Sequence, residues 1–408
     1  MSQEFHEKAL NYHRGARPGK IQVSSHKNIN THQGLSLAYT PGVAAPVREI
    51  LKNPNTVNEY TIKGNLVAVV TDGSAVLGLG NTGPLAAKPV MEGKAVLFKR
   101  FADIDVFDIE LDTQDVDEIV QTIKNIAPTF GGINLEDISA PRCFEIEQRL
   151  IDELDIPVFH DDQHGTAIIV AAGLLNAMEI QGKTTDTVKV VCAGGGSAGI
   201  ATLNLIAELG VKRENMILVD RNGVVSKDKK KKVNKYKAAF AVDTKKETLS
   251  DAMNGADVFI GVARGDLVTQ EMVKTMAEKP IIFALSNPDP EISPVDAFSC
   301  RNDLLMATGR SDYPNQVNNV LGFPYIFRGA LDANSKEINT EMKIAAVHAL
   351  KDLAKLPVPN SVLQAYQIDS LSYGRDYIIP KPFDPRLIDI VPKAIFEAAV
   401  SSGVSCLT

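Results

Sequence analysis

The sequence predicts an α/β protein built on doubly wound parallel sheets, and three observations support this prediction. Short apolar segments rich in β-branched residues alternate with helical patterns along the chain. One of these segments runs into a glycine-rich loop that opens a helix. Polar residues stand directly after several of the segments, where ligands of parallel sheets bind. With 408 residues, the chain has room for two or three domains.

The first part of the chain contains four predicted strands that are separated by helices. An amphipathic helix over 4–13 comes first, and a polar loop then leads to a turn at 37–42 that contains Pro41. The predicted strands are 66–71, 103–111, 133–135 and 158–159. The helices between them are 84–100, 115–126 and 141–154, and a glycine-rich passage at 78–84 precedes the first.

The stretch VKVVCAGGGSAGIATLNL (188–205) combines a buried strand, a glycine loop and a helix. Its glycines have G-x-G-x-x-G spacing: Gly194 permits the tight turn, Gly196 lets the backbone approach a pyrophosphate, and Gly199 lets the helix pack closely. The helix N-terminus offers N–H groups to the phosphates. A second strand, 216–219, ends in Asp220, where a ribose-binding acid is expected. A plain glycine turn is the alternative, but this order of elements favours a Rossmann-type dinucleotide domain.

The rest of the chain continues the alternation of strands and helices. A helix is predicted near 248–253, and two or three helices close the chain after a polar loop at 314–319. The predicted strands in this part are 258–261, 281–285 and 304–307. We expect two α/β regions with a boundary near 160–166.

Composition and charge argue against several classes of function. The net charge of −7 argues against general nucleic-acid binding. No apolar run reaches the ~18 residues of a membrane span, and the charged N-terminus lacks the apolar core of a signal peptide. The four cysteines stand far apart without a C-x-x-C pair, so we expect free thiols in a reducing compartment.

Two predicted strands each end in a pair of acids, Glu136 with Asp137 and Asp161 with Asp162. Four acids at two strand ends suggest a hard divalent cation with oxygen ligands, Mg²⁺ or Mn²⁺. Adjacent residues on a strand face opposite sides, so Glu136 and Asp137 can share one ion only if their strand has already ended. The same argument leaves one of Asp161 and Asp162 as a ligand and the other free for another task. Solvated loop acids and helix caps are the alternative, which two pairs at parallel strand ends make less favourable.

Lys94 and Tyr39 are candidates whose role the local pattern leaves open. Lys94 lies among apolar residues of the helix 84–100, and its amine either snorkels to solvent or is desolvated near a cation. In the second case its pKa falls and it becomes a usable base. Tyr39 stands beside Pro41 in the turn, where a tyrosine is more often a packing residue than an acid.

On these residues the chain resembles the malic enzymes in their short, bacterial-type form. The matching stretches follow the family order over most of the chain: LAYTPGVA (37–44), VTDGSAVLGLGNTGP (70–84), MEGKAVLFK (91–99), GINLEDI (132–138), FHDDQHGTA (159–167), AGGGSAGIA (193–201), FALSNP (283–288) and PNQVNN (314–319). The resemblance implies metal-dependent oxidative decarboxylation of L-malate to pyruvate and CO₂ with NAD⁺ or NADP⁺, by a cytoplasmic homodimer.

The resemblance also implies a role for each matching residue. Tyr39 is the proton donor, Lys94 is the proton acceptor, and Asp161 orients Lys94. The implied metal ligands are Glu136, Asp137 and Asp162. Malate is expected to contact Lys94, Asn287, Asn318 and Asn319. The implied cofactor-binding residues are Gly194, Gly195, Gly196, Ser197, Ala198, Gly199, Asp220, Arg221 and Asn287.

The expected domains are 1–160 for substrate, metal and dimerisation, 161–317 for NAD(P), and a helical segment 318–408 that packs back across both. Two departures from the family stand out. Larger relatives carry an arginine for a substrate carboxylate where this chain has Ala75. The chain also stops after the cofactor domain, so we expect no phosphotransacetylase-like extension.

The choice between NAD⁺ and NADP⁺ stays open in the sequence. Asp220 favours two free ribose hydroxyls and repels a 2′-phosphate. Arg221 and the lysines at 227, 229–232, 235 and 237 could offset this repulsion, although such a run is more often a solvated loop.

Three other functions are compatible with parts of the pattern. The first is a malolactic-type, redox-neutral decarboxylation with tightly held NAD. The second is an amino-acid dehydrogenase, which pairs a catalytic lysine with a dinucleotide domain and needs no metal. The third is a non-enzymatic nicotinamide-binding regulator, which the retention of every candidate catalytic residue disfavours.

Overall fold

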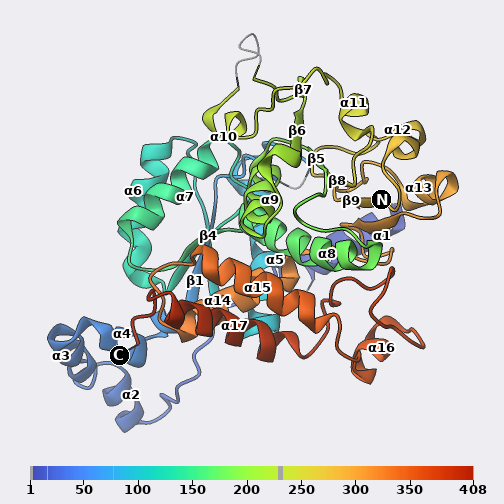
Figure 1. The fold of residues 1–408 in the computed structure, drawn as a ribbon. Coiled ribbons are helices and arrows are strands. Elements are labelled where there is room, and N and C mark those ends of the chain that lie inside the picture. The colour runs from blue at the N-terminus through green and yellow to red at the C-terminus, as the bar shows by residue number, and fades with distance from the viewer. Residues whose placement is uncertain (1–2, 16, 77, 228–232, 408) are drawn as a thin grey trace.

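Two parallel sheets organise the chain in a computed structural model that describes residues 3–15, 17–76, 78–227 and 233–407 (Figure 1). The first sheet has the strand order β2-β1-β3-β4, and the second has the order β10-β9-β8-β5-β6-β7. All strand pairs within them are parallel except β6 with β7. The predicted α/β fold with doubly wound parallel sheets is confirmed, because helices cover the sheets between successive strands.

The first sheet is built from four strands, with β1 and β3 in its interior. Their bounds are β1 (Leu66–Thr71), β2 (Asp105–Glu110), β3 (Gly132–Leu135) and β4 (Val158–His160). Every residue of β1 is buried because the strand has a neighbour on each side. The helices of this unit are α5 (Pro84–Ala102), α6 (Val116–Ile126) and α7 (Arg142–Glu153). These elements follow the predicted order closely.

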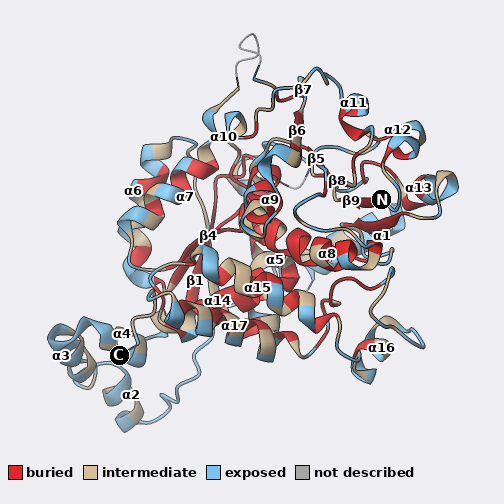
Figure 2. Cartoon of the chain, in the orientation of Figure 1, coloured by how far each residue is buried: buried red, intermediate tan, exposed pale blue. Residues whose placement is uncertain are grey.

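The second sheet begins after α8 (Thr166–Gln181), a helix that is apolar on all sides because it packs against α9, α15 and β9. The strands are β5 (Val190–Ala193), β6 (Met216–Asp220), β7 (Gly223–Val224), β8 (Val258–Gly261), β9 (Ile281–Ala284) and β10 (Leu305–Thr308). The helices are α9 (Ser197–Glu208), α10 (Lys235–Ala238), α11 (Leu249–Met253), α12 (Gln270–Thr275) and α13 (Pro294–Cys300). Figure 2 shows the strands and α8 as the buried interior.

Four α-helices close the chain, where two or three were predicted. They are α14 (Phe323–Asp332), α15 (Thr340–Leu353), α16 (Asn360–Tyr366) and α17 (Leu387–Ser401). Helix α14 packs on α5 of the first unit, where the ring of Phe98 lies 4.8 Å from that of Phe323 and 5.4 Å from that of Phe327. Helix α15 packs on α8 next to the second sheet. The closing helices therefore contact both sheet units.

The N-terminal arm, residues 32–62, differs from the predicted loop. After the expected helix α1 (Gln3–Arg14), the chain forms α2 (His32–Ala38), α3 (Ala44–Lys52) and α4 (Val57–Tyr60). The prediction of a polar loop up to residue 37 was wrong because Thr31 caps a short helix, its side chain accepting a hydrogen bond from the Gly34 backbone N–H. None of the three arm helices contains a buried residue, and Figure 2 shows them pale blue.

Short 3₁₀ segments connect several of these elements: η1 (Pro54–Thr56), η2 (Ile62–Asn65), η3 (Ala127–Thr129), η5 (Arg213–Asn215) and η6 (Asn319–Leu321). Of the helices in the described ranges, none combines the length and the apolar character that a membrane crossing requires. The four cysteines are free thiols, and Cys143 and Cys192 are buried as the sequence predicted.

Candidate active site and metal centre

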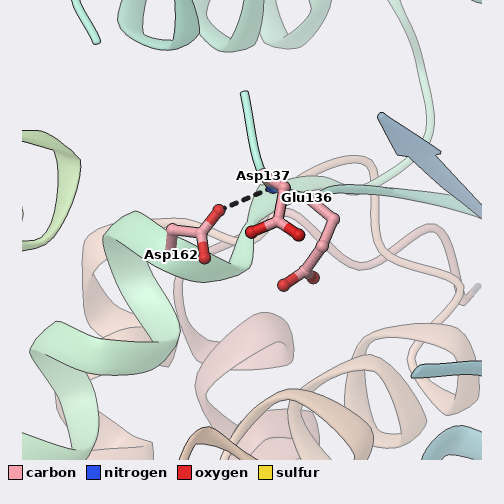
Figure 3. A group of neighbouring side chains, drawn as sticks. All are labelled: Glu136, Asp137 and Asp162. Carbon is pink, nitrogen blue, oxygen red and sulfur yellow. Dashed lines mark hydrogen bonds between the residues drawn. The ribbon is translucent and has the colours of Figure 1, made fainter. Parts of the chain in front are cut away.

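Three carboxylates converge where β3 and β4 end (Figure 3). Glu136 and Asp137 follow β3, Asp162 follows β4, and one oxygen from each lies within 4.8 Å of the others. Asp162 Oδ2 accepts a hydrogen bond from the Asp137 backbone N–H at 2.8 Å. Strand β3 ends at Leu135, and Asp137 has a φ of +54°, so the two neighbours no longer alternate as strand residues do. Both side chains can therefore face one point.

This donor set fits a divalent cation with oxygen ligands. Glu136 and Asp137 are buried, and Asp162 is half-buried. Burial raises the pKa of Glu136 well above its usual range; Lys94 opposes the rise, and the charge of Asp162 adds to it. Such mutual repulsion of buried carboxylates is relieved by a cation, and carboxylate oxygens are the ligands that Mg²⁺ and Mn²⁺ prefer.

Asp72 also follows a strand but lies outside this trio of carboxylates. It forms an ion pair with Arg142 at 2.9 Å and accepts a hydrogen bond from the Ser74 hydroxyl at 2.5 Å. These contacts account for the charge of a fully buried side chain. Its place at a strand end therefore has a structural explanation.

One turn of π-helix, η4 (Asp161–Gly165), turns two adjacent acids toward different partners. Asp162 faces Asp137, whereas Asp161 Oδ2 lies 2.5 Å from Lys94 Nζ. A side chain on Gly165 would prevent this arrangement, since its Cβ would lie 1.9 Å from Asp161 Oδ1. The structure thus separates the two acids as the sequence argument required.

Lys94 reaches the carboxylates from the middle of α5. Its Nζ lies 3.1 Å from Glu136 Oε1 and 4.2 Å from the centre of the Phe323 ring, and its side chain is only 12% exposed, so it does not snorkel to solvent. Burial by itself would lower the pKa of the ammonium, but Asp161 and Glu136 outweigh burial and hold it above its usual value. The sequence left the direction of this shift open; in the chain by itself the pKa of Lys94 is raised, because its nearest partners are anions.

Tyr39 does not lie beside Lys94 and the three carboxylates of its own chain. It ends helix α2 in the N-terminal arm, and its side chain is 70% exposed. In Figure 1, α2 lies at the edge of the molecule, well apart from β4 and the turn that follows it. The predicted turn at Tyr39 is present, but a role for this residue in its own chain's site has no geometric support.

The glycine loop between β5 and α9 has the geometry of a dinucleotide site. Gly194 has a φ of +122°, which favours glycine. A Cβ on Gly199 would lie 1.9 Å from the Gly194 carbonyl oxygen, so the helix can approach the loop only without a side chain there. A Cβ on Gly196 would meet no protein atom within 4 Å, which leaves open space beside the loop. Ser197 and Ala198 form the first turn of α9, which directs its N–H groups at this space.

Asp220 ends β6 next to this loop, and its partner is Lys237. The two side chains form an ion pair at 2.7 Å, and Lys237 Cε lies 2.8 Å from the place of a Cβ on Gly195. Burial would raise the pKa of Asp220, but the hydrogen bond from Lys237 lowers it below the usual range. Arg221 is exposed beside the pair. Lysines 229–232, which we also considered for a 2′-phosphate, lie outside the described residues.

The three candidate asparagines have different environments. Asn319 donates a hydrogen bond to Asp161 Oδ2 at 3.0 Å, which joins it to the Lys94 cluster. Asn318 instead caps the short helix η6 through a backbone N–H two residues later. Asn287 is exposed after β9, and a Cβ on Gly78 would lie 2.5 Å from its carbonyl oxygen. The loops that follow β1 and β9 therefore meet at Asn287.

Two buried glutamates near these loops were missed by the sequence argument. Glu147 on α7 bonds to the turn η4, and Glu291 bonds to the loops after β8 and β9. A signal for Glu147 was present: it lies on the apolar face of its helix, four residues after Cys143 and three before Leu150. A carboxylate on such a face is buried and needs donors.

Comparison with known proteins gives a consistent result over nearly the whole chain. Residues 18–115 and 113–151 match the family model "Malic enzyme, N-terminal domain", and residues 163–366 match "Malic enzyme, NAD binding domain". The crystal structure of a malic enzyme from Pyrococcus horikoshii superposes with a TM-score of 0.90 at 43% identity, covering 99% of this chain and 92% of that one.

Curated relatives carry related names. An NADP-dependent malic enzyme of Halomonas elongata is 56% identical over 99% of this chain and 96% of its own length. An NADP-dependent malic enzyme of Rhizobium meliloti is 55% identical over 98% of this chain, which spans 52% of that longer protein. A second protein of the same organism, named NAD-dependent malic enzyme, is 52% identical, and again the chain spans about half of it (52%).

Proposed function

The chain belongs to the malic enzyme family, and on this premise we propose that its site carries out metal-dependent oxidative decarboxylation of L-malate to pyruvate and CO₂ with reduction of NAD(P)⁺. The observation that carries the proposal is the convergence of Glu136, Asp137 and Asp162 beside the amine of Lys94. The four free cysteines fit the reducing cytoplasm that we propose as its compartment.

Glu136, Asp137 and Asp162 would hold the divalent cation. When bound, the cation would polarise the C2 oxygen of malate as hydride passes from C2 to the nicotinamide. It would then stabilise the charge that the loss of CO₂ leaves at that oxygen. Lys94 is the group of this chain that would take the proton of the C2 hydroxyl, and it must be a neutral amine to do so. A cation held by the trio would repel its ammonium, whose Nζ lies 3.1 Å from Glu136 Oε1, and would so lower the pKa that the unbalanced carboxylates raise. Asp161 and the Phe323 ring hold that amine in place.

The malate carboxylates must be held without an arginine at Ala75. Asn319 and Asn287 are the amide groups that we assign to them. Asn319 already bonds to Asp161 of the cluster, and Asn287 lies where the loops after β1 and β9 meet. Asn318 is a weaker candidate, since its side-chain oxygen caps η6. Closure of the two loops around malate would also exclude water from the reaction.

We propose that Tyr39 acts as the proton donor in the site of a second copy of this chain, within a homodimer. The N-terminal arm exposes large apolar side chains, which include Leu37, Tyr39 and Leu51 at 68%, 70% and 79% exposure. Several large exposed apolar side chains in one segment are typical of a protein interface. A second copy as the partner accounts both for this surface and for the distance between Tyr39 and its own site.

A mixing experiment tests this arrangement. Tyr39→Phe and Lys94→Ala are each expected to be inactive, but a mixed dimer has one site with an intact tyrosine and an intact lysine. Random reassembly of the two variants should restore about a quarter of wild-type activity if the tyrosine acts across the interface. No recovery in verified mixed dimers would show that Tyr39 acts within its own chain or not at all.

NADP⁺ is the coenzyme that the site favours. The Lys237 ammonium is paired with Asp220, so it offsets the charge that would repel a 2′-phosphate, and it lies over the glycine loop. Relatives of both coenzyme types occur, so family membership alone does not decide between them.

Lys237→Gln should lower the ratio of kcat/KM for NADP⁺ to that for NAD⁺ by about 10- to 100-fold. An unchanged ratio would remove Lys237 from coenzyme selection.

The proposed function is tested by absorbance at 340 nm with malate, Mn²⁺ and each coenzyme. We expect reduced coenzyme to accumulate together with pyruvate, and a chelator to abolish both. Lactate formed without reduced coenzyme would indicate the malolactic reaction, and activity on an amino acid that survives the chelator would indicate a metal-free dehydrogenase. The absence of turnover with every substrate would favour a nicotinamide-binding regulator.

A further inference from the structure

Glu147 is a buried carboxylate that the proposed chemistry does not use. It lies on α7, 6% exposed, on the side of the first sheet unit that faces the turn η4. Helix α7 follows β3 directly, so the element that carries Glu147 begins only a few residues after the ligands Glu136 and Asp137. A buried carboxylate needs several donors, and their positions show what it organises.

All three of its donors come from residues 160–164. Glu147 Oε1 accepts from the His160 backbone N–H at 2.8 Å. Its Oε2 accepts from Gln163 Nε2 at 3.1 Å and lies 3.0 Å from His164 Nε2. The three bonds thus hold the residue before Asp161 and the two residues after Asp162.

This bracing matters because η4 is a single turn of π-helix between the end of β4 and the start of α8, so its backbone continues the regular hydrogen bonding of neither element. Asp161 and Asp162 are adjacent, yet one faces Lys94 and the other faces Asp137. A small rotation of the turn would move both carboxylates at once. Holding both ends of the turn to one carboxylate prevents that rotation.

The charge of Glu147 is compensated by His164 and by a lysine of the C-terminal helix α15. Lys343 of α15 places its Nζ 3.4 Å from His164 Nε2, inside the protein. Burial would raise the pKa of Glu147, but His164, Lys343 and His160 lower it to about 2. Glu147 is therefore a carboxylate at neutral pH and a full acceptor for its three donors.

We propose that Glu147 is a positioning residue that sets the metal affinity of this chain by holding the η4 turn, and with it Asp162, in the geometry that faces Glu136 and Asp137. The inference rests on the proposed metal site and deepens it. Residues that orient metal ligands typically change metal affinity or activity by about 10- to 100-fold when they are replaced.

The chain contains a matched control in the second unit. Glu291 is fully buried and also accepts from two loops: from the Ala263 backbone N–H at 3.0 Å and from the Ser286 backbone N–H at 3.2 Å. These loops follow β8 and β9 on the coenzyme side. Glu291→Gln therefore disturbs a braced buried carboxylate of the same kind, but away from the metal ligands.

The experiment measures Mn²⁺ binding by electron paramagnetic resonance and NADPH binding by fluorescence, on purified protein without malate. Glu147→Gln keeps the size of the side chain but replaces one acceptor oxygen with a donor. We expect its Kd for Mn²⁺ to rise about 10- to 100-fold while its Kd for NADPH stays within about twofold of wild type. Glu291→Gln should show the reverse pattern.

Two results would overturn the inference: an unchanged Mn²⁺ Kd in folded Glu147→Gln, or equal loss of both ligands in both variants. If Glu147→Gln does not fold, Gln163→Met removes one of the three donors, and its Mn²⁺ Kd should rise several-fold; no rise would be equally decisive. A wild-type protein that binds no Mn²⁺ would instead refute the proposed metal site, and this inference with it.

Discussion

The proposed metal centre and the dinucleotide loop both lie at the carboxyl ends of parallel strands, yet they are built in opposite ways. The proposed metal centre consists of ionisable side chains from the end of β3, from η4 and from α5, each of which is at least half-buried. The dinucleotide loop consists of glycines, whose lack of side chains leaves room for tight packing at Gly199 and for open space at Gly196.

This difference shows that a site made of side chains depends on distant parts of the chain, whereas a site made of backbone groups does not. The glycine loop is complete within six consecutive residues, because its function is to expose backbone N–H groups. The carboxylates need Lys94 from α5, Glu147 from α7 and Asn319 from the start of η6. Substitutions at the carboxylates should therefore affect metal-dependent turnover, and substitutions in the glycine loop should affect coenzyme binding.

The largest effect is expected for Asp162→Asn, which removes a ligand charge but keeps the size of the side chain. Metal-dependent turnover should fall by about a thousandfold or more, because charge stabilisation by the cation contributes several kcal/mol. The Kd for NADPH should stay close to wild type, because the Asp162 side chain bonds to the Asp137 backbone and faces the other carboxylates. Steady-state rates measure the turnover, and fluorescence titration measures the Kd for NADPH. A parallel loss of turnover and of NADPH binding would contradict the separation of the two sites.

Gly165→Ala should come next in magnitude. The new Cβ would lie 1.9 Å from Asp161 Oδ1, so the carboxylate that holds Lys94 must move. A displacement of about 1 Å at such a group can cost about 100-fold in kcat. The KM for coenzyme should change little. A wild-type kcat in this variant would show that the position of Asp161 does not limit the reaction.

A pair of alanine substitutions sharpens the description of the glycine loop. Gly196→Ala meets no protein atom within 4 Å, so we expect unchanged thermal stability but about tenfold weaker NADPH binding, because the methyl group occupies phosphate space. Gly199→Ala overlaps the Gly194 carbonyl and should lower the free energy of unfolding by about 1–3 kcal/mol. If Gly196→Ala and Gly199→Ala lowered the free energy of unfolding equally, the loop would have no open space for a ligand beside Gly196.

Much of the fold could be predicted because its signals are local. The apolar runs that became β1, β3, β8 and β9 are buried parallel strands whose patterns need no information from elsewhere. The glycine spacing and the acid at the end of β6 likewise depend on adjacent residues. The convergence of Glu136, Asp137 and Asp162 was expected only because parallel strands bring their carboxyl ends together.

What could not be predicted depends on contacts between distant residues. The pKa of Lys94 is raised because η4 and the end of β3 present carboxylates to it, and no pattern within α5 shows this. The helices of the N-terminal arm are short, at seven, nine and four residues, so each offers few turns from which a helical pattern can be identified. In the proposed dimer the partner of Tyr39 lies in a second copy, and a pattern within one chain does not show such a contact.

The central claim is that acids from two strand ends form one divalent-cation site beside Lys94. Anomalous X-ray diffraction from a crystal of the protein grown with Mn²⁺ tests it most directly. The account predicts one strong peak per chain, bounded by carboxylate oxygens of Glu136, Asp137 and Asp162. A crystal that takes up Mn²⁺ only elsewhere, with these three carboxylates empty, would contradict it.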